Sequence, residues 1–180
     1  MRIVAGRWRG RTLKGPTWDG LRPTSDRLRE TLFNILGPSV RDARVLDGYA
    51  GTGAIGIEAL SRGAAAVTFV ERDPRAVKLI EANLASLSAG EAAKPVIIRA
   101  GLADAVTRLG GQVFDLIILD PPYAHGAAAE ALDAAGALAA PHTRVVIEHA
   151  ARHAPPDAHA GLRRTRTVTA GDSALSLYEH

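Results

Sequence analysis

The segment FDLIILDPPYAHG, residues 114–126, joins an apolar run to a carboxylate, two prolines and an aromatic ring. The apolar run predicts a buried strand, so Asp120 would lie at the strand's carboxyl end, the edge at which open α/β sheets bind ligands. The two prolines have fixed φ angles and offer carbonyls with no competing N–H, which makes the turn rigid. Tyr123 would then present an aromatic face beside the carboxylate.

This arrangement suits the methylation of an amine. Asp120 and the Pro121 carbonyl could accept the two N–H bonds of an exocyclic amine on a nucleobase and turn its lone pair toward a methyl donor. Tyr123 would stack on the base, which has to leave its helix to reach such a pocket. We therefore predict a catalytic turn of Asp120, Pro121, Pro122 and Tyr123. The alternative is an ordinary strand-ending turn capped by the aspartate.

A glycine loop, DGYAGTGAIG at residues 47–56, supplies a second candidate site. It contains G-x-G-x-x-G, and Glu71 follows Gly51 by 20 residues, a pattern typical of dinucleotide binding. Asp47, however, would repel a diphosphate by a few kcal/mol at a separation of about 4 Å and an effective dielectric constant of about 20. S-adenosylmethionine carries cationic amino and sulfonium groups and a ribose but no phosphate, so it suits both carboxylates. A tight strand–helix turn in an unrelated α/β protein is the alternative.

Strands and helices alternate between these motifs. The near-continuous apolar character of the strands is typical of a parallel sheet covered on both faces by helices, and in such a sheet Asp47 and Asp120 would face one crevice. The tail instead predicts an antiparallel hairpin, residues 163–170 with 174–180. The expected strands are residues 44–47, 66–71, 95–99, 114–120 and 143–149, and the expected helices begin near residues 24, 54, 74, 103 and 127.

The positive charge is concentrated at the N-terminus. The whole chain has a net charge of +3, but residues 1–29 alone hold eight basic and two acidic side chains. We expect residues 2–5 and 12–14 to form a hairpin whose arginines meet a polyanion, with Trp8 stacking on a base. A solvated N-terminus without a partner is the alternative. The eight basic residues are Arg2, Arg7, Arg9, Arg11, Lys14, Arg22, Arg27 and Arg29.

Composition excludes several other classes of protein. The chain has no cysteine, so it has neither a disulfide framework nor a thiolate metal site. Its six histidines lack the spacing of metal ligands, and we expect no metal. The start of the chain lacks the apolar region of a signal peptide, and no segment approaches about 18 consecutive apolar residues. We therefore expect a cytoplasmic protein with no membrane partner.

The chain resembles the RsmD family of 16S ribosomal RNA guanine-N2 methyltransferases. The resemblance implies an α/β fold, a Rossmann-like sheet of seven strands, mostly parallel with the last strand antiparallel, preceded by a β-hairpin/helix extension. It divides the chain into a basic extension, residues 1–23, and a methyltransferase domain, residues 24–180. The stretches that carry it are MRIVAGRWRGRTLKGP, LRPTSDRLRETLFNIL, DGYAGTGAIGIEALSRGA, FVERD, FDLIILDPPY, VVIEH and GDSALSLY.

The resemblance also implies an activity and its residues. A monomer would transfer a methyl group from S-adenosylmethionine to the exocyclic N2 of a guanine in 16S ribosomal RNA, within a small-subunit particle. The expected cofactor residues are Asp47, Gly51, Gly53, Glu71, Arg72, Gly101, Leu102 and Asp120. The expected RNA-binding residues are Arg7, Trp8, Arg9, Arg11, Arg22, Thr24 and Arg29.

Two departures from the family pattern and three alternatives remain. Gly48-Tyr49 stands where the family has two bulky residues, as in DLFAG, and the stretch RAGLAD lacks the aspartate that often binds adenine, which leaves that role to the backbone of residues 100–102. Asp104 could substitute from the following helix. The amine could instead belong to adenine, or the chain could be a non-catalytic RNA-binding module. An NAD-dependent oxidoreductase is disfavoured because no hydride-transfer group accompanies the loop.

Overall fold

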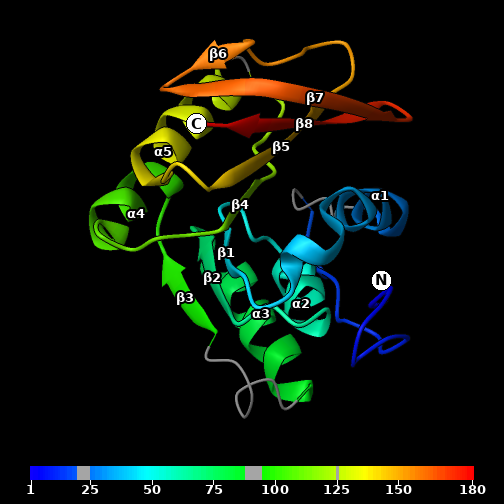
Figure 1. The fold of residues 1–180 in the computed structure, drawn as a ribbon. Helices are drawn as coiled ribbons and strands as arrows, with labels where there is room; N and C mark the ends of the chain where they lie inside the picture. Colours follow the sequence, from blue (N-terminus) through cyan, green and yellow to red (C-terminus); the bar gives the residue numbers. More distant parts are fainter. Residues whose placement is uncertain (20–24, 88–94, 125) are drawn as a thin grey trace.

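Eight strands form one sheet in the computed structural model, which describes residues 1–19, 25–87, 95–124 and 126–180 (Figure 1). The strands are β1 (Arg44–Asp47), β2 (Ala66–Glu71), β3 (Val96–Arg99), β4 (Leu116–Leu119), β5 (Arg144–Ala150), β6 (Ala158–His159), β7 (Leu162–Ala170) and β8 (Ser173–Glu179). The helices are α1 (Asp26–Leu36), the 3-10 turn η1 (Gly37–Val40), α2 (Ala54–Ser61), α3 (Pro74–Ser86), α4 (Leu102–Leu109) and α5 (Ala127–Leu138).

The strand order is β3-β2-β1-β4-β5-β8-β7-β6. Strands β1 to β5 pair in parallel, and β8 inserts antiparallel between β5 and β7. The predicted mostly parallel sheet with an antiparallel last strand is therefore confirmed. The predicted number of strands is too small by one, because the two-residue β6 pairs with the outer edge of β7 and is too short to show an apolar pattern.

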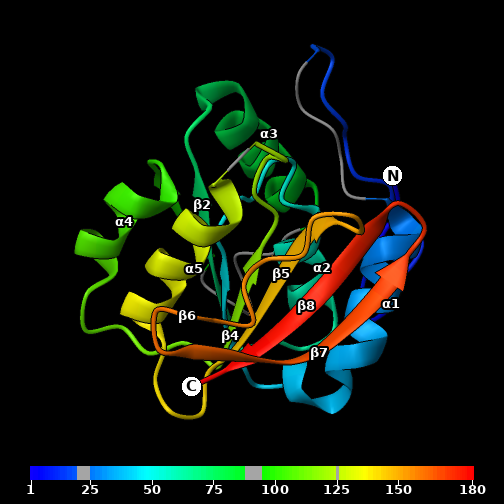
Figure 2. The ribbon, with the colours of Figure 1, turned by 90° about the horizontal axis from the view of Figure 1, so that it is seen from above.

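Helices cover the two faces of the sheet as two layers (Figure 2). Side chains of α1, α2 and α3 pack with one face of the central strands into a first apolar core, and those of α4 and α5 pack with the other face into a second. Because β4 is buried along its whole length, both of its faces must be apolar, which explains its unbroken LIIL sequence.

Local sequence signals set where the helices begin. The Ser25 hydroxyl caps α1 by accepting a hydrogen bond from the Leu28 amide at 3.2 Å, and Asp26 lies in the first turn. Asp73 caps α3 by accepting from the Arg75 amide at 2.8 Å, and Pro74 occupies the first position of that helix. Both predicted helix starts are confirmed.

The N-terminal extension packs on the first core. The predicted hairpin is reduced to one antiparallel bridge, Arg2 with Thr12, flanked by hydrogen bonds such as that from the Leu13 amide to the Met1 carbonyl at 3.1 Å. Ile3, Trp8 and Leu13 are buried in the same core as α1 and α2. Residues 1–13 therefore have a fixed place against the rest of the chain. Within the described residues, no helix has the length and apolar character needed to cross a membrane.

Candidate active site

Strand register brings three carboxylates to one level at the carboxyl edge of the sheet. Asp47 pairs with Phe69 of β2 and with Ile118 of β4, and Ile118 pairs with Val146 of β5. Glu71 and Glu148 lie two residues further along β2 and β5, and Asp120 lies two residues after Ile118, just past the end of β4. At about 3.3 Å per residue, these three residues are about 6.6 Å closer to the carboxyl edge than Asp47. Asp47 itself lies one level lower, beneath the loop that follows β1.

A cavity of about 650 Å³ opens above this edge. Its walls are the glycine loop after β1, the end of β2, the segment after β3, the DPPY turn after β4, and single residues from α1, β5 and β8. This volume lies in the range of small-molecule sites. The cavity therefore unites the two motifs that sequence analysis singled out. The predicted cofactor residues that line it are Gly51, Glu71, Arg72, Gly101, Leu102 and Asp120.

Asp47 does not line the cavity, contrary to the expectation that it faces the ligand. Its carboxylate is 1% exposed and accepts a hydrogen bond from the Gly56 amide at 2.9 Å, in the first turn of α2. Burial raises the pKa of Asp47 to about 7; the Gly56 hydrogen bond opposes this rise and the charge of Glu71 adds to it. Asp47 therefore supports the loop from below, and Gly53 begins α2 with φ 78°.

Glu71 holds the glycine loop in place through its carboxylate. Its Oε2 accepts from the Gly51 amide at 2.8 Å, and its Oε1 accepts from the Asp73 amide, also at 2.8 Å. These bonds tie the glycine loop to the segment after β2. Each carboxylate oxygen has a second lone pair, so the side chain can still accept ribose hydroxyls in the cavity.

Close packing explains two glycines of the loop. A Cβ on Gly56 would lie 2.2 Å from the Phe69 ring, so the third glycine of the motif allows α2 to press on β2. A Cβ on Gly48 would lie 2.6 Å from Cδ2 of Leu119. The departure from the DLFAG pattern thus has a packing reason, because the side chains of Leu119 and Leu102 fill the space beside Gly48.

In the DPPY turn, a buried proline precedes an exposed aromatic ring. Pro121 is buried, whereas Tyr123 is 56% exposed and lines the cavity with Asp120. The Tyr123 hydroxyl donates to Oε1 of Glu148 at 3.0 Å and lies 3.0 Å from the Ser173 hydroxyl. Burial of the hydroxyl end raises the pKa of Tyr123, and the hydrogen bond with Ser173 opposes this. No local sequence pattern predicted a role for Ser173 or this contact of Glu148.

The segment after β3 offers backbone rather than a carboxylate to the cavity. Gly101 and Leu102 line it, whereas Asp104 is exposed on the first turn of α4 and does not. Within the described residues, no group of histidine and acidic side chains could hold a metal ion.

The arginines predicted to meet RNA fall into different environments. Arg7, Arg9 and Arg11 are exposed; Arg7 lies 4.2 Å from the centroid of the Trp8 ring, and Arg11 donates to the Ser86 carbonyl at 2.6 Å. The expectation that Trp8 stacks on a base is wrong for this conformation, because Trp8 is 9% exposed and packs in the first core. Arg22 and Thr24 lie outside the described residues.

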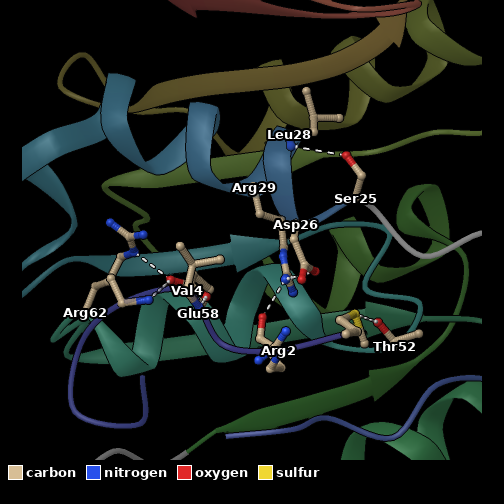
Figure 3. A network of polar contacts seen from close by, with 11 residues as sticks. Arg2, Val4, Ser25, Asp26, Leu28, Arg29, Thr52, Glu58 and Arg62 are labelled. Atoms are coloured by element: carbon tan, nitrogen blue, oxygen red, sulfur yellow. Dashed lines mark hydrogen bonds and ion pairs between the residues drawn. The ribbon is translucent and has the colours of Figure 1, made fainter. Parts of the chain in front are cut away.

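The RNA-binding role expected of Arg29 is also wrong for this conformation, since its side chain is fully buried (Figure 3). It donates to Asp26 at 2.6 Å and to the Arg2 carbonyl at 2.7 Å. Burial lowers the pKa of Arg29, while the charges of Asp26 and Glu58 oppose this. Arg29 shares one face of α1 with Leu28 and Leu32, and that face is turned toward the protein.

Two further contacts were not foreseen from sequence. Glu58, fully buried on α2, accepts from the Val4 and Ala5 amides at 2.8 and 2.9 Å and pairs with Arg62 at 2.8 Å (Figure 3). A lone glutamate in the apolar helix sequence AIGIEALS was the available signal. Trp18, rather than Trp8, is partly exposed, and Arg75 lies 5.0 Å from its ring centroid.

Comparisons with known proteins agree with this geometry. A family model described as "Conserved hypothetical protein 95" matches residues 1–179. The chain is 38% identical over 183 residues to ribosomal RNA small subunit methyltransferase D of Escherichia coli K12, covering 99% of this chain and 89% of that protein. The structure of the putative methyltransferase yhhF from Escherichia coli matches with a TM-score of 0.83 and 36% identity, over 100% of this chain and 97% of that one.

A more distant structure shares the fold. The putative methyltransferase SMU.776, complexed with SAH, matches with a TM-score of 0.65 and 16% identity, over 85% of this chain and 48% of that one. The family model and the relative from Escherichia coli both span nearly the full length of the chain. The chain therefore belongs to the RsmD family, that of ribosomal RNA small subunit methyltransferase D, and is a methyltransferase.

Proposed function

We propose that the protein transfers a methyl group from S-adenosylmethionine to the exocyclic N2 of a guanine in 16S ribosomal RNA. The observation that carries this proposal is the single cavity shared by the glycine loop, Glu71 and the DPPY turn. One end of that cavity suits a ribose and an adenine, and the other holds a carboxylate beside an exposed aromatic ring.

The cofactor would be held by the loop and the two following segments. Glu71 accepts the ribose hydroxyls, the backbone of Gly101 and Leu102 contacts the adenine, and Gly51 permits close approach of the loop. S-adenosylmethionine supplies an electrophilic methyl group on a sulfonium. Asp47 stays beneath the loop, where its hydrogen bond to Gly56 keeps the start of α2 in place.

The DPPY turn orients the amine. Asp120 and the Pro121 carbonyl accept the two N2 hydrogens, which directs the nitrogen lone pair toward the methyl donor and stabilises the positive charge that develops on nitrogen. Asp120 also accepts the proton that the nitrogen must lose. Tyr123 stacks on the extruded base with its exposed ring.

Exposed arginines of the extension supply contacts to phosphates. Arg7, Arg9 and Arg11 are exposed. Residues 1–23 act as an RNA-binding extension of a methyltransferase domain formed by residues 24–180. The substrate is 16S RNA assembled in a small-subunit particle, and the protein acts on it as a monomer in the cytoplasm. Trp18 with Arg75 adds a second stacking surface for RNA.

The substitution Asp120→Ala tests this function. We expect S-adenosylhomocysteine to bind with nearly unchanged affinity by titration calorimetry, while methyl transfer from labelled S-adenosylmethionine is lost. Asp104→Ala, which changes a carboxylate outside the cavity, should keep full turnover. Unchanged turnover in Asp120→Ala contradicts the role of Asp120.

Analysis of the product and of ligand specificity tests the rest. Nucleoside mass spectrometry of small-subunit particles and naked 16S RNA should identify N2-methylguanosine, with more product from particles. N6-methyladenosine would refute guanine as the target. Tight binding of NAD without binding of S-adenosylhomocysteine would refute the cofactor.

A further inference from the structure

Glu148 is placed where it can contact the target base. The register of β4 with β5 pairs Leu119 with Ile147, the last pair of β4. Asp120 directly follows the end of β4, and Glu148 is the next residue on β5. Neighbouring strands lie about 4.8 Å apart, and paired residues point to the same face of the sheet. Glu148 is 8% exposed, yet it lines the cavity together with Asp120 and Tyr123.

The two oxygens of the Glu148 carboxylate have different surroundings. Oε1 accepts the Tyr123 hydroxyl at 3.0 Å. Among the residues that the structure describes, none donates a hydrogen bond to Oε2, and no ion pair includes Glu148. Oε2 is not sealed in the core, and Glu148 lines the cavity. A donor on a ligand that enters the cavity can therefore replace water at this oxygen.

Guanine supplies such a donor beside the methylated nitrogen. Its Watson–Crick edge carries N1–H directly next to the N2 amine, whereas adenine has a bare N1 with a lone pair next to N6. With Asp120 and Pro121 occupied by the amine, the adjacent N1–H would face the next acceptor along the sheet edge. A carboxylate in that position attracts N1–H and repels a lone pair.

We propose that Glu148 accepts the N1–H of the target guanine and thereby selects guanine over bases with an unprotonated N1. This inference depends on the proposed function, since it assumes a guanine held by its N2 amine. Tyr123 then does two things: its ring stacks on the base, and its hydroxyl fixes the Glu148 carboxylate at the edge of that base. Ser173 holds the other side of the hydroxyl.

The test replaces the target guanine by 2-aminopurine, which keeps the N2 amine but has no hydrogen on N1. Particles are reconstituted with 16S RNA carrying either base at the mapped target position, and kcat/KM for methylation is measured. The unaltered enzyme should prefer guanine by about 100-fold or more, because a buried acceptor left facing a lone pair is strongly unfavourable. Glu148→Gln should lower kcat/KM for guanine about 10- to 100-fold and bring the ratio between the bases close to one, since an amide can present either an oxygen or an NH₂ group.

Two variants distinguish recognition of the base by Glu148 from support of the Tyr123 ring. Both Tyr123→Phe and Ser173→Ala retain the Glu148 carboxylate, although Tyr123→Phe removes its hydrogen bond from the Tyr123 hydroxyl. Ser173→Ala should therefore keep the full preference for guanine, and Tyr123→Phe should keep a reduced preference, even where kcat/KM falls. Binding of S-adenosylhomocysteine and thermal unfolding of each variant report whether the fold is intact.

Three results would overturn the proposal. A ratio unchanged by Glu148→Gln would mean that Glu148 only holds Tyr123. Equal methylation of both bases by the unaltered enzyme would refute recognition of N1–H while leaving the proposed function intact. Absence of any methylation of guanine by the unaltered enzyme would refute the proposed function and this inference together.

Discussion

The substitution Glu58→Ala should release the N-terminal extension from the rest of the protein. Glu58 is fully buried and accepts three hydrogen bonds, from the amides of Val4 and Ala5 and from the guanidinium of Arg62. Alanine leaves both amides without an acceptor and leaves Arg62 without its carboxylate. The helix itself should tolerate the change, because alanine has the highest helix propensity.

The expected cost follows from these contacts. Breaking a buried ion pair by removing one partner costs about 3–5 kcal/mol, but the Arg62 side chain is 19% exposed and can regain water. We therefore expect the free energy of unfolding to fall by about 3 kcal/mol. For a domain of this size the melting temperature should fall by roughly 6–12 °C. Glu58→Gln keeps one acceptor oxygen and should cost only about 1–2 kcal/mol.

Denaturant unfolding followed by tryptophan fluorescence measures this cost, since Trp8 belongs to the extension and is buried in the first core. Limited trypsin digestion measures release of the extension through faster cleavage at Arg7, Arg9 and Arg11. Glu81→Ala, an exposed position on α3, is the matched control and should lie within about 0.5 kcal/mol of the unaltered protein. A Glu58→Ala protein that unfolds like this control and resists trypsin equally would refute the reasoning.

Three other substitutions test single features. Because the pKa of Asp47 is raised to about 7 in the folded state, the folded protein favours the neutral carboxyl, and the unaltered protein should lose stability as the pH rises from about 4 to about 7. The free energy of unfolding of Asp47→Asn, relative to that of the unaltered protein, should rise over this range by up to about 4 kcal/mol. A difference in urea unfolding that stays constant across this range would contradict the raised pKa of Asp47. Arg29→Met should keep both stability and RNA affinity, since a buried arginine can often be replaced by an apolar side chain of similar size and Asp26 is 54% exposed; weaker RNA binding by a folded variant would restore the RNA-binding role. Arg9→Ala should reduce the slope of log affinity against log salt concentration by about 0.7–0.9, and an equal slope would remove Arg9 from the interface.

Features that depend on neighbouring residues in the chain could be predicted from sequence. Ser25 and the Asp73-Pro74 pair mark helix starts because capping is completed within three residues. The uninterrupted apolar strand before Asp120 predicts its place at the carboxyl edge of a parallel sheet. The same reasoning predicts the glycine loop after β1, and the structure joins that loop and Asp120 in one cavity.

Features that depend on burial among distant segments could not be predicted in this way. An arginine among other arginines was expected to be exposed, but Arg29 faces inward because α1 turns that side toward the extension and α2. Trp8 was expected to meet a base, but its ring completes the first core. Asp47 was expected in the cavity, and the register of β1 with β4 instead sets it one level below Asp120.

The sequence by itself determined the elements, the carboxyl-edge position of Asp120 and the family of the protein, because each is carried by short contiguous stretches. Only the tertiary structure decided which polar side chains are exposed and which of them form hydrogen bonds with residues far away in the sequence. Glu58 meets residues 4 and 5 across more than 50 positions, and Tyr123 meets Glu148 and Ser173 across 25 and 50 positions. Such pairs are chosen by the packing of whole strands and helices, which no local spacing of residues records.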